Sequence, residues 1–283
     1  MIPGSKCIFS IYNEGTNFRR KYRHDNVKYY NENLKRLTRN HNLYANYCKA
    51  DFYLYADPKF YNAFKLHYFY DYPFLDDFDL INFYKFYQLY YLSKTYEKVI
   101  YLDLDLVWTG LRENIFEDYD FYNGFLINSE TYPYKDLEQV LYVGEGQHKE
   151  HWENPLKAYL ASMLLNNKSS MKYFNTGLMG CTFSYADQLN YFDGIELSIE
   201  HLYNFYNDNK NILTFKDNGE DKIGYDNETI AAVQFIRNKV QIQPFKTGTI
   251  KPAQYTEEDK NILFCHVFSK KKFNNLVLDT HAW

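Results

Sequence analysis

Residues 99–108, VIYLDLDLVW, place two carboxylates inside an otherwise apolar stretch. Four apolar residues, 99–102, precede Asp103, and a single leucine separates Asp103 from Asp105. A continuous apolar run is typical of a strand that is buried on both faces, as in a parallel sheet. Residues i and i+2 of an extended chain point to the same side, and a buried carboxylate is costly unless it is paired. The stretch therefore predicts a central strand whose end presents two acids on one side, where a divalent cation can hold both.

Size and charge narrow the class of protein. The 283 residues are 46% hydrophobic, which is enough for one large α/β domain or two small ones. We find no linker rich in glycine, serine or proline, so a single domain over residues 1–283 is the simpler prediction. The formal charge of −4 gives no support for nucleic acid as the main partner.

The length of the apolar runs and the spacing of the cysteines predict the cellular compartment of the protein. No apolar run approaches the roughly 18 residues that a membrane-spanning helix needs, so we expect no transmembrane segment. Residues 1–13 lack the basic and apolar regions of a signal peptide. The four cysteines are dispersed without CxxC spacing. We therefore expect free thiols in a reducing, cytoplasmic compartment. The sequence leaves the oligomeric state open.

The first part of the chain alternates between strand and helix patterns. Strands are expected at residues 6–12, 51–56 and from 99, and helices at 26–40, 60–70 and 80–92. This rhythm predicts an α/β fold with a mostly parallel central sheet flanked by helices.

The pattern is looser after residue 108. The expected elements are a strand at 121–128, a strand–turn–strand unit at 173–181, helices at 187–207 and 225–236, and strands at 240–244 and 262–266. Residues 133–170 hold no clean strand pattern, and we expect them to face an acceptor.

Polar residues follow several expected strand ends, where open α/β sheets bind ligands. They are Asn13, Asp57, the pair Asp103 and Asp105, and His266. Two carboxylates and an imidazole suit a divalent ion such as Mn²⁺, or Mg²⁺ with more oxygen ligands. Each feature alone also has an ordinary structural explanation as a strand end, a helix cap or a solvated side chain. Their joint occurrence favours a site.

Four further segments occur in a recognisable order. NFYKFY (82–87) precedes the Asp-x-Asp strand, and FNTGLM (174–179), DNE (226–228) and HVFSKKK (266–272) follow it. In these motifs the chain resembles the retaining glycosyltransferases of the GT-A fold, family 8, of the glycogenin and bacterial lipopolysaccharide galactosyltransferase type. The chain departs from the family pattern at Asn227, at Ser269, at Phe273 with Asn274, and at the non-acidic end of its first strand.

The resemblance implies a single Rossmann-like domain and roles for named residues. Residues 1–108 would form the nucleotide-binding half, and residues 109–283 the acceptor and donor-sugar half. The metal ligands would be Asp103, Asp105 and His266. The catalytic residues would be Lys85, Asp226 and Asn227, and the donor would further be bound by Asn13, Asp57, Asn175, Gly177 and Lys272. Asp226 has an alternative role as a helix N-cap.

The implied activity is transfer of a hexose from a nucleotide-diphosphate sugar, expected to be a UDP-sugar, to a glycan, protein or lipid acceptor with retention. One alternative is a phosphatase of the haloacid dehalogenase type, because DLDLV also fits its Asp-x-Asp motif with Asp103 as nucleophile. Two expected strands precede that motif here, however, whereas it normally opens the first core strand. A third alternative is a sugar-binding protein without catalysis. The sequence does not distinguish the donor sugars.

Overall fold

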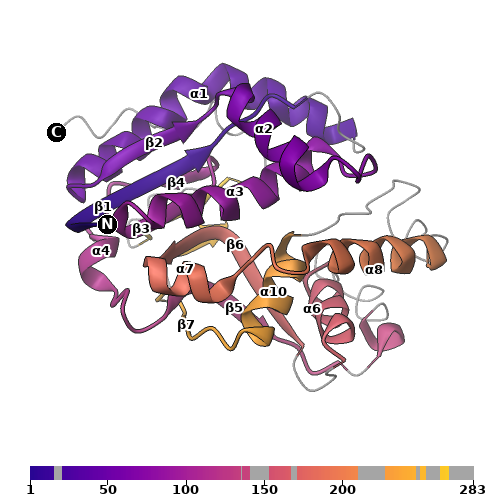
Figure 1. Cartoon of the computed structure of the whole chain (residues 1–283). Coiled ribbons are helices and arrows are strands. Elements are labelled where there is room, and N and C mark those ends of the chain that lie inside the picture. The colour runs from indigo at the N-terminus through magenta and orange to yellow at the C-terminus, as the bar shows by residue number, and fades with distance from the viewer. Residues whose placement is uncertain are drawn as a thin grey trace.

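The computed structural model describes residues 1–15, 21–134, 136–140, 153–166, 171–209, 227–246, 249–252 and 262–267 (Figure 1). Within these ranges the first half of the chain contains β1 (Ile2–Ile11), α1 (Lys21–Tyr47), β2 (Asp51–Tyr55), α2 (Pro58–Phe69), α3 (Asp77–Ser93), β3 (Tyr96–Leu102) and β4 (Leu106–Trp108). The second half contains α4 (Ile115–Asp118), β5 (Phe125–Thr131), α6 (Glu153–Leu164), β6 (Lys172–Cys181), α7 (Phe183–Leu189), α8 (Ile195–Asp208), α10 (Asn227–Arg237), β7 (Ile242–Gln243), β8 (Ile250–Pro252) and β9 (Phe264–His266).

The strands form one large sheet and one small sheet. The large sheet has the order β2-β1-β3-β6-β5-β7, and the small one has the order β4-β9-β8. In the large sheet β1 pairs in parallel with β2 and β3, β5 pairs in parallel with β7, and β6 is antiparallel to both its neighbours. The predicted α/β class with a mostly parallel central sheet is confirmed. Because β3 pairs with β6, segments on either side of residue 108 share one sheet.

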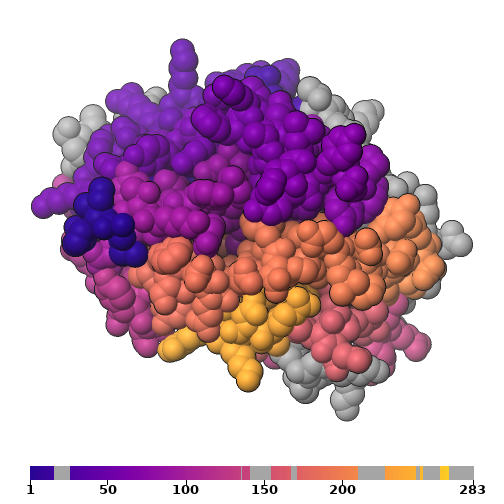
Figure 2. Space-filling view, in the orientation of Figure 1, coloured from indigo at the N-terminus to yellow at the C-terminus, as the bar shows by residue number. Residues whose placement is uncertain are grey.

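The side chains of β3 explain its continuous apolar pattern. Val99 and Tyr101 belong to the core cluster that α3 covers, whereas Ile100 and Leu102 belong to a second cluster that includes Tyr44 of α1. Successive side chains of a strand point to opposite faces, so both faces of β3 are buried. In Figure 1 the two helices lie on opposite sides of the sheet. Figure 2 shows α7 and α8 (orange) packed directly against the purple N-terminal elements.

Two expectations about the later elements were wrong. Residues 173–181 form one strand, β6, and not two strands with a turn; its register with β5 shifts between the Ile127–Met179 and Asn128–Asn175 pairs. The single helix expected at 187–207 is divided into α7 and α8. Asn190, with φ 44°, ends α7 in the left-handed conformation, and the chain then turns before α8 begins.

The remaining expected elements are found with shifted bounds, α1 being longer at both ends than the helix expected at 26–40. All four cysteines are buried and unpaired, as expected. In the described part of the chain, no helix combines the length and the apolar character that crossing a bilayer requires.

Two neighbouring side chains of α1 hold the backbone of β4. The Asn40 amide accepts from the Trp108 N–H at 2.8 Å and donates to the Trp108 carbonyl at 3.1 Å. The ring of His41 lies between the Leu106 carbonyl, 2.6 Å from Nε2, and the Ser10 hydroxyl, 2.8 Å from Nδ1. Since a carbonyl can only accept, Nε2 carries the proton and Nδ1 accepts from Ser10. Burial lowers the pKa of His41 to about 4, so the ring is neutral at pH 7.

We expect His41 to make stability depend on pH between about 6.5 and 4. Its pKa of about 4 in the folded chain lies below the value of about 6.5 in an unfolded chain, so the unfolded state binds the proton first as the pH falls. This contribution is fully present above pH ~6.5 and is lost as the pH falls to ~4, amounting to roughly 3 kcal/mol at most.

Urea unfolding of the wild type and of His41→Asn at several pH values measures this dependence. The free energy of unfolding of the variant is expected to change less over the same window. The exposed His67→Asn variant serves as the control and keeps the wild-type dependence. An identical dependence in wild type and His41→Asn would contradict the assignment.

Candidate active site

The two acids of the Asp-x-Asp motif lie on a turn between the two sheets. β3 ends at Leu102, and the Leu106 N–H donates to the Asp103 carbonyl at 2.9 Å. The expectation that both acids share one side of an extended strand is therefore wrong. The physical reason is that the chain changes sheets here, because β4 pairs with β9 and not with β6. The turn points the two carboxylates towards different partners.

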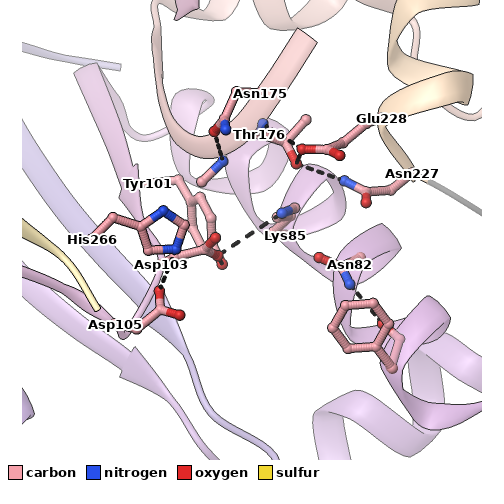
Figure 3. A network of polar contacts seen from close by, with 12 residues as sticks. Asn82, Lys85, Tyr101, Asp103, Asp105, Asn175, Thr176, Asn227, Glu228 and His266 are labelled. Carbon is pink, nitrogen blue, oxygen red and sulfur yellow. Dashed lines mark hydrogen bonds and ion pairs between the residues drawn. The ribbon is translucent and has the colours of Figure 1, made fainter. Parts of the chain in front are cut away.

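Asp103 faces a buried lysine and a tyrosine (Figure 3). Lys85 of α3 is only 2% exposed, and its Nζ lies 3.9 Å from Asp103 Oδ1 and 5.3 Å from the centre of the Tyr101 ring. The Tyr101 hydroxyl donates to the same Asp103 oxygen. Burial raises the pKa of Tyr101 well above its ordinary value, so this hydroxyl stays a donor at neutral pH.

The charge of Asp103 is balanced between opposing influences. Its side chain keeps 31% of its accessible surface, so a ligand can reach it. Desolvation by the surrounding protein nevertheless raises the pKa of this carboxyl, and the charge of Asp105 raises it further. The Lys85 ammonium opposes both effects. Lys85 therefore helps to keep a crowded carboxylate ionised, and Asp103 compensates the buried charge of Lys85.

Asp105 lies between α1 and β9. Its Oδ1 is 3.5 Å from Nε2 of His266, and its Oδ2 accepts from the Tyr30 hydroxyl at 3.0 Å. The antiparallel pairing of β4 with β9 sets Leu106 opposite His266, and the Val267 N–H donates to the Asp105 carbonyl at 3.0 Å. The small sheet thus brings the His266 imidazole beside Asp105, although the two residues lie 161 positions apart in the sequence.

Carboxylate and imidazole groups are suitable ligands for a divalent cation, but only two of them are placed here to bind one ion together. Asp105 Oδ1 and His266 Nε2 are close enough to be two ligands of one ion, since each ligand would lie about 2.1 Å from it. Asp103 instead turns towards Lys85 and Tyr101. Within the described ranges, no three carboxylate, imidazole or thiol groups converge as a ready metal site.

The FNTGLM segment approaches Asp103 closely. The Asp103 N–H donates to the Gly177 carbonyl at 2.8 Å, and the Gly177 N–H donates to Asn175 Oδ1 at 3.0 Å. A Cβ atom on Gly177 would lie 2.9 Å from Asp103 Oδ2 and 3.3 Å from Asn175 Oδ1. Only glycine leaves this space open, and the side-chain oxygens of Asn175 and Asp103 both border it.

The first turn of α10 contacts the same segment. Asn227 donates from Nδ2 to Thr176 Oγ1 at 2.8 Å, and its carbonyl accepts from the Tyr191 hydroxyl. Asn227 is buried, so its side-chain amide makes its hydrogen bonds with protein groups. The structure thus brings together Lys85, Asp103, Asp105, Asn175, Gly177, Asn227 and His266, which come from α3, the turn after β3, β6, α10 and β9.

The other proposed site residues that the structure describes are Asn13 and Asp57, which follow β1 and β2. Asn13 accepts from the Gly15 N–H at 3.1 Å in a local turn after β1. Asp57 is the N-cap of α2 and accepts from the Lys59 N–H at 2.8 Å. A capping role alone explains Asp57. Asp226 and Lys272 lie outside the described residues.

Sequence reasoning missed two residues beside the site. Glu228 binds the Thr176 N–H at 3.2 Å, and Lys157 lies 2.6 Å from Glu228. A signal for Glu228 existed, because it directly follows Asn227 in the DNE segment. Lys157 carried no signal, since it lies 71 positions from its partner in a segment without a motif.

Comparison with known proteins gives similarity in structure only. No protein-family model and no curated protein matches the chain. A glycosyltransferase involved in the glycosylation of the major capsid of PBCV-1 aligns over 96% of this chain and 98% of its own, with 12% identity and a TM-score of 0.47. Mouse xyloside xylosyltransferase 1 aligns over 94% and 98%, with 9% identity and a TM-score of 0.43. An active-site mutant of LgtC aligns over 95% and 94%, with 11% identity and a TM-score of 0.41. At this level the similarities assign the chain to no family.

Proposed function

We propose that this chain is a GT-A type glycosyltransferase that moves a hexose from a nucleotide-diphosphate sugar, a UDP-sugar, to a glycan, protein or lipid acceptor with retention. The observation that carries the proposal is the meeting of Lys85, Asp103, Asp105 and His266 beyond the carboxyl end of β3. A fixed cation and groups that can bind a metal suit a leaving group that departs as a diphosphate.

The chemistry assigns a role to Lys85. In glycosyl transfer the bond between the anomeric carbon and the diphosphate oxygen breaks, and the electron pair leaves with the phosphate while the sugar becomes oxocarbenium-like. A buried ammonium next to that oxygen stabilises the developing negative charge more than an ammonium in water would. Asp103 and the Tyr101 ring orient Lys85 for this task. With retention by front-face attack, the departing phosphate oxygen accepts the proton of the acceptor hydroxyl.

The remaining residues are proposed to bind the donor and the cation. Asp105 and His266, with Asp103 as third ligand, would hold Mn²⁺ or Mg²⁺, whose charge would neutralise the diphosphate. Asn175, Gly177 and Asn227 would line the donor sugar. Among the residues outside the described ranges, Lys272 would contact the phosphates and Asp226 the sugar.

A ligand panel tests this function. UDP, other nucleotides and their sugar conjugates, each with and without Mn²⁺, are added while the melting temperature is followed. Ligand at 100 times its Kd stabilises the folded chain by about 2.7 kcal/mol, which is a shift of several degrees for a chain of this size. We expect a UDP-sugar with Mn²⁺ to give the largest shift. The proposal fails if no member of the panel stabilises the chain.

The same panel separates the alternatives. A phosphatase that uses Asp103 as nucleophile would be stabilised by vanadate or another phosphate mimic without any nucleotide. A sugar-binding protein without catalysis would respond to glycans alone and would not release UDP.

Two glycine substitutions separate a site effect from a core effect. Gly177→Ala is expected to displace the Asp103 carboxylate, which is a movable group, and to weaken UDP-sugar binding about tenfold or more with little loss of stability. Gly180→Ala would place its Cβ 2.5 Å from Ile100 Cδ1 and 3.2 Å from Leu126 Cδ1 in the core. It is expected to lower stability by ~1–3 kcal/mol.

Calorimetric titration with a UDP-sugar and urea unfolding measure the two effects. Unchanged donor affinity in a folded Gly177→Ala variant would remove the Asn175–Gly177 segment of β6 from the proposed site. The Gly180→Ala variant, where it folds, is expected to keep the wild-type affinity.

A further inference from the structure

The Glu228 carboxylate connects α10 with α6 and β6 at the edge of the candidate site. Figure 3 shows Glu228 beside Thr176. Its Oε2 lies 2.6 Å from Nζ of Lys157 on α6. Its Oε1 accepts from the Thr176 N–H at 3.2 Å and from the Tyr173 hydroxyl at 3.1 Å, both on β6. The side chains of Lys157 and Glu228 are only 18% and 14% exposed, so water hydrates neither charge fully. The two charges therefore compensate each other, and the donors from β6 also stabilise the Glu228 carboxylate.

The contact with Thr176 occurs where β6 loses its regular pairing. The register between β5 and β6 shifts directly after Asn175, so Thr176 lies between the regular pairs. A buried N–H that lacks an acceptor costs free energy, and Thr176 is 1% exposed. Glu228 supplies this acceptor, and the neighbouring Asn227 amide binds the Thr176 hydroxyl at 2.8 Å. The first turn of α10 thus holds the irregular part of β6.

This irregular part carries the groups that face Asp103. Asn175 and Gly177 flank Thr176, and the Gly177 carbonyl accepts from the Asp103 N–H. Any movement of Thr176 therefore moves the side-chain oxygen of Asn175 and the open space over Gly177. Both oxygens of Glu228 contact protein groups, and the oxygen that accepts from the Thr176 N–H connects Glu228 to this part of β6.

We propose that Glu228 and Lys157 are a positioning pair that sets the donor-sugar side of the site through Thr176. The ligand named in this inference, a UDP-sugar, rests on the proposed function. The effect of the pair on the position of Thr176 does not depend on that function. Loss of the pair is expected to weaken contacts to the sugar while contacts to the nucleotide persist, because the metal-binding groups and Lys85 lie on other elements.

Two readouts on one set of variants test the proposal. The first is hydrogen exchange of a peptide covering residues 173–178 in the absence of ligand. The second is the ratio of the Kd values for UDP and for a UDP-sugar. In Glu228→Gln the Lys157 ammonium no longer faces a carboxylate at this position and competes for the amide oxygen that Thr176 needs. We expect faster exchange in this peptide and about tenfold weaker binding of the UDP-sugar, with the Kd of UDP unchanged.

A double variant and a matched control sharpen the test. In Lys157→Met/Glu228→Gln the competing cation is absent, and the glutamine oxygen can again accept from Thr176. We expect exchange and the Kd ratio to return to within about threefold of wild type. Asp77→Asn is the control, because Asp77 likewise binds a lysine, Lys65, and a tyrosine hydroxyl at the start of α3. It is expected to lower stability without changing either readout.

Each outcome decides the proposal. Unchanged exchange in Glu228→Gln, an equal loss of UDP and UDP-sugar binding, or no recovery in the double variant would overturn it. If Glu228→Gln does not fold, Glu228→Asp replaces it, since the shorter side chain keeps the charge but withdraws from Thr176, and faster exchange is again expected. If the wild type binds neither ligand, the proposed function falls, and the exchange data alone decide whether the pair positions Thr176.

Discussion

Replacing Lys85 with methionine is expected to reduce the rate of sugar transfer by about 100-fold or more. Methionine fills the buried volume of the lysine side chain but removes the charge that faces Asp103 at 3.9 Å. The departing diphosphate then lacks a fixed cation in a position where water cannot replace it. Release of UDP from a UDP-sugar, measured as kcat with saturating donor, reports the loss.

Lys94→Met is the matched control for this prediction. Lys94 is the C-cap of the same helix, and its Nζ lies 4.2 Å from the centre of the Tyr90 ring, away from the proposed site. The control is expected to keep wild-type activity. Wild-type kcat in a folded Lys85→Met variant would show that the buried ammonium takes no part in the reaction.

Replacing Asp103 with asparagine is expected to abolish metal-dependent hydrolysis of the donor. The change keeps the shape of the side chain but removes the negative charge of one of the three proposed metal ligands. His266→Ala is expected to have the same effect, because it removes the imidazole next to Asp105. Titration of activity with Mn²⁺ measures the result, and neither variant is expected to hydrolyse the donor at any Mn²⁺ concentration.

Metal removal and a matched control complete this test. Treatment of the wild type with a chelator is expected to stop donor hydrolysis, and added Mn²⁺ is expected to restore it. Asp51→Asn is the control, because Asp51 also accepts from a tyrosine hydroxyl, that of Tyr96, at 2.7 Å but lies at the start of β2. Full activity after chelation would rule out the metal site while leaving the transferase proposal intact.

Elements with strong local patterns were predicted well. The strand at β3 was recognised because both of its faces are buried, so its apolar residues form a continuous run. The helix expected at 60–70 lies close to α2, which in the structure begins at Pro58 with Asp57 as its N-cap. In both cases neighbours in sequence carry the information, and tertiary contacts act in the same direction.

Elements that depend on distant partners were predicted less well. The FNTGLM segment looked like a turn because of its asparagine and glycine, but β6 continues through it with a shift in register. Its pairing with β3 on one side keeps the strand extended there. The aspartate turn was missed for the opposite reason, because the apolar residues after Asp105 continue the pattern of a strand that belongs to a different sheet.

By itself the sequence determined the α/β class, the buried central strand and the set of chemical groups around it. The class and the strand follow from hydrophobic periodicity, which is a local property. The chemical groups were expected from polar residues at strand ends and from the resemblance in motif order along the chain. Only the tertiary structure decided that Asp103 faces Lys85, that Asp105 faces His266, and that Glu228 and Lys157 hold Thr176. The physical reason is that these contacts depend on strand register and helix packing, and a shift of one residue would turn a side chain to the other face of a strand.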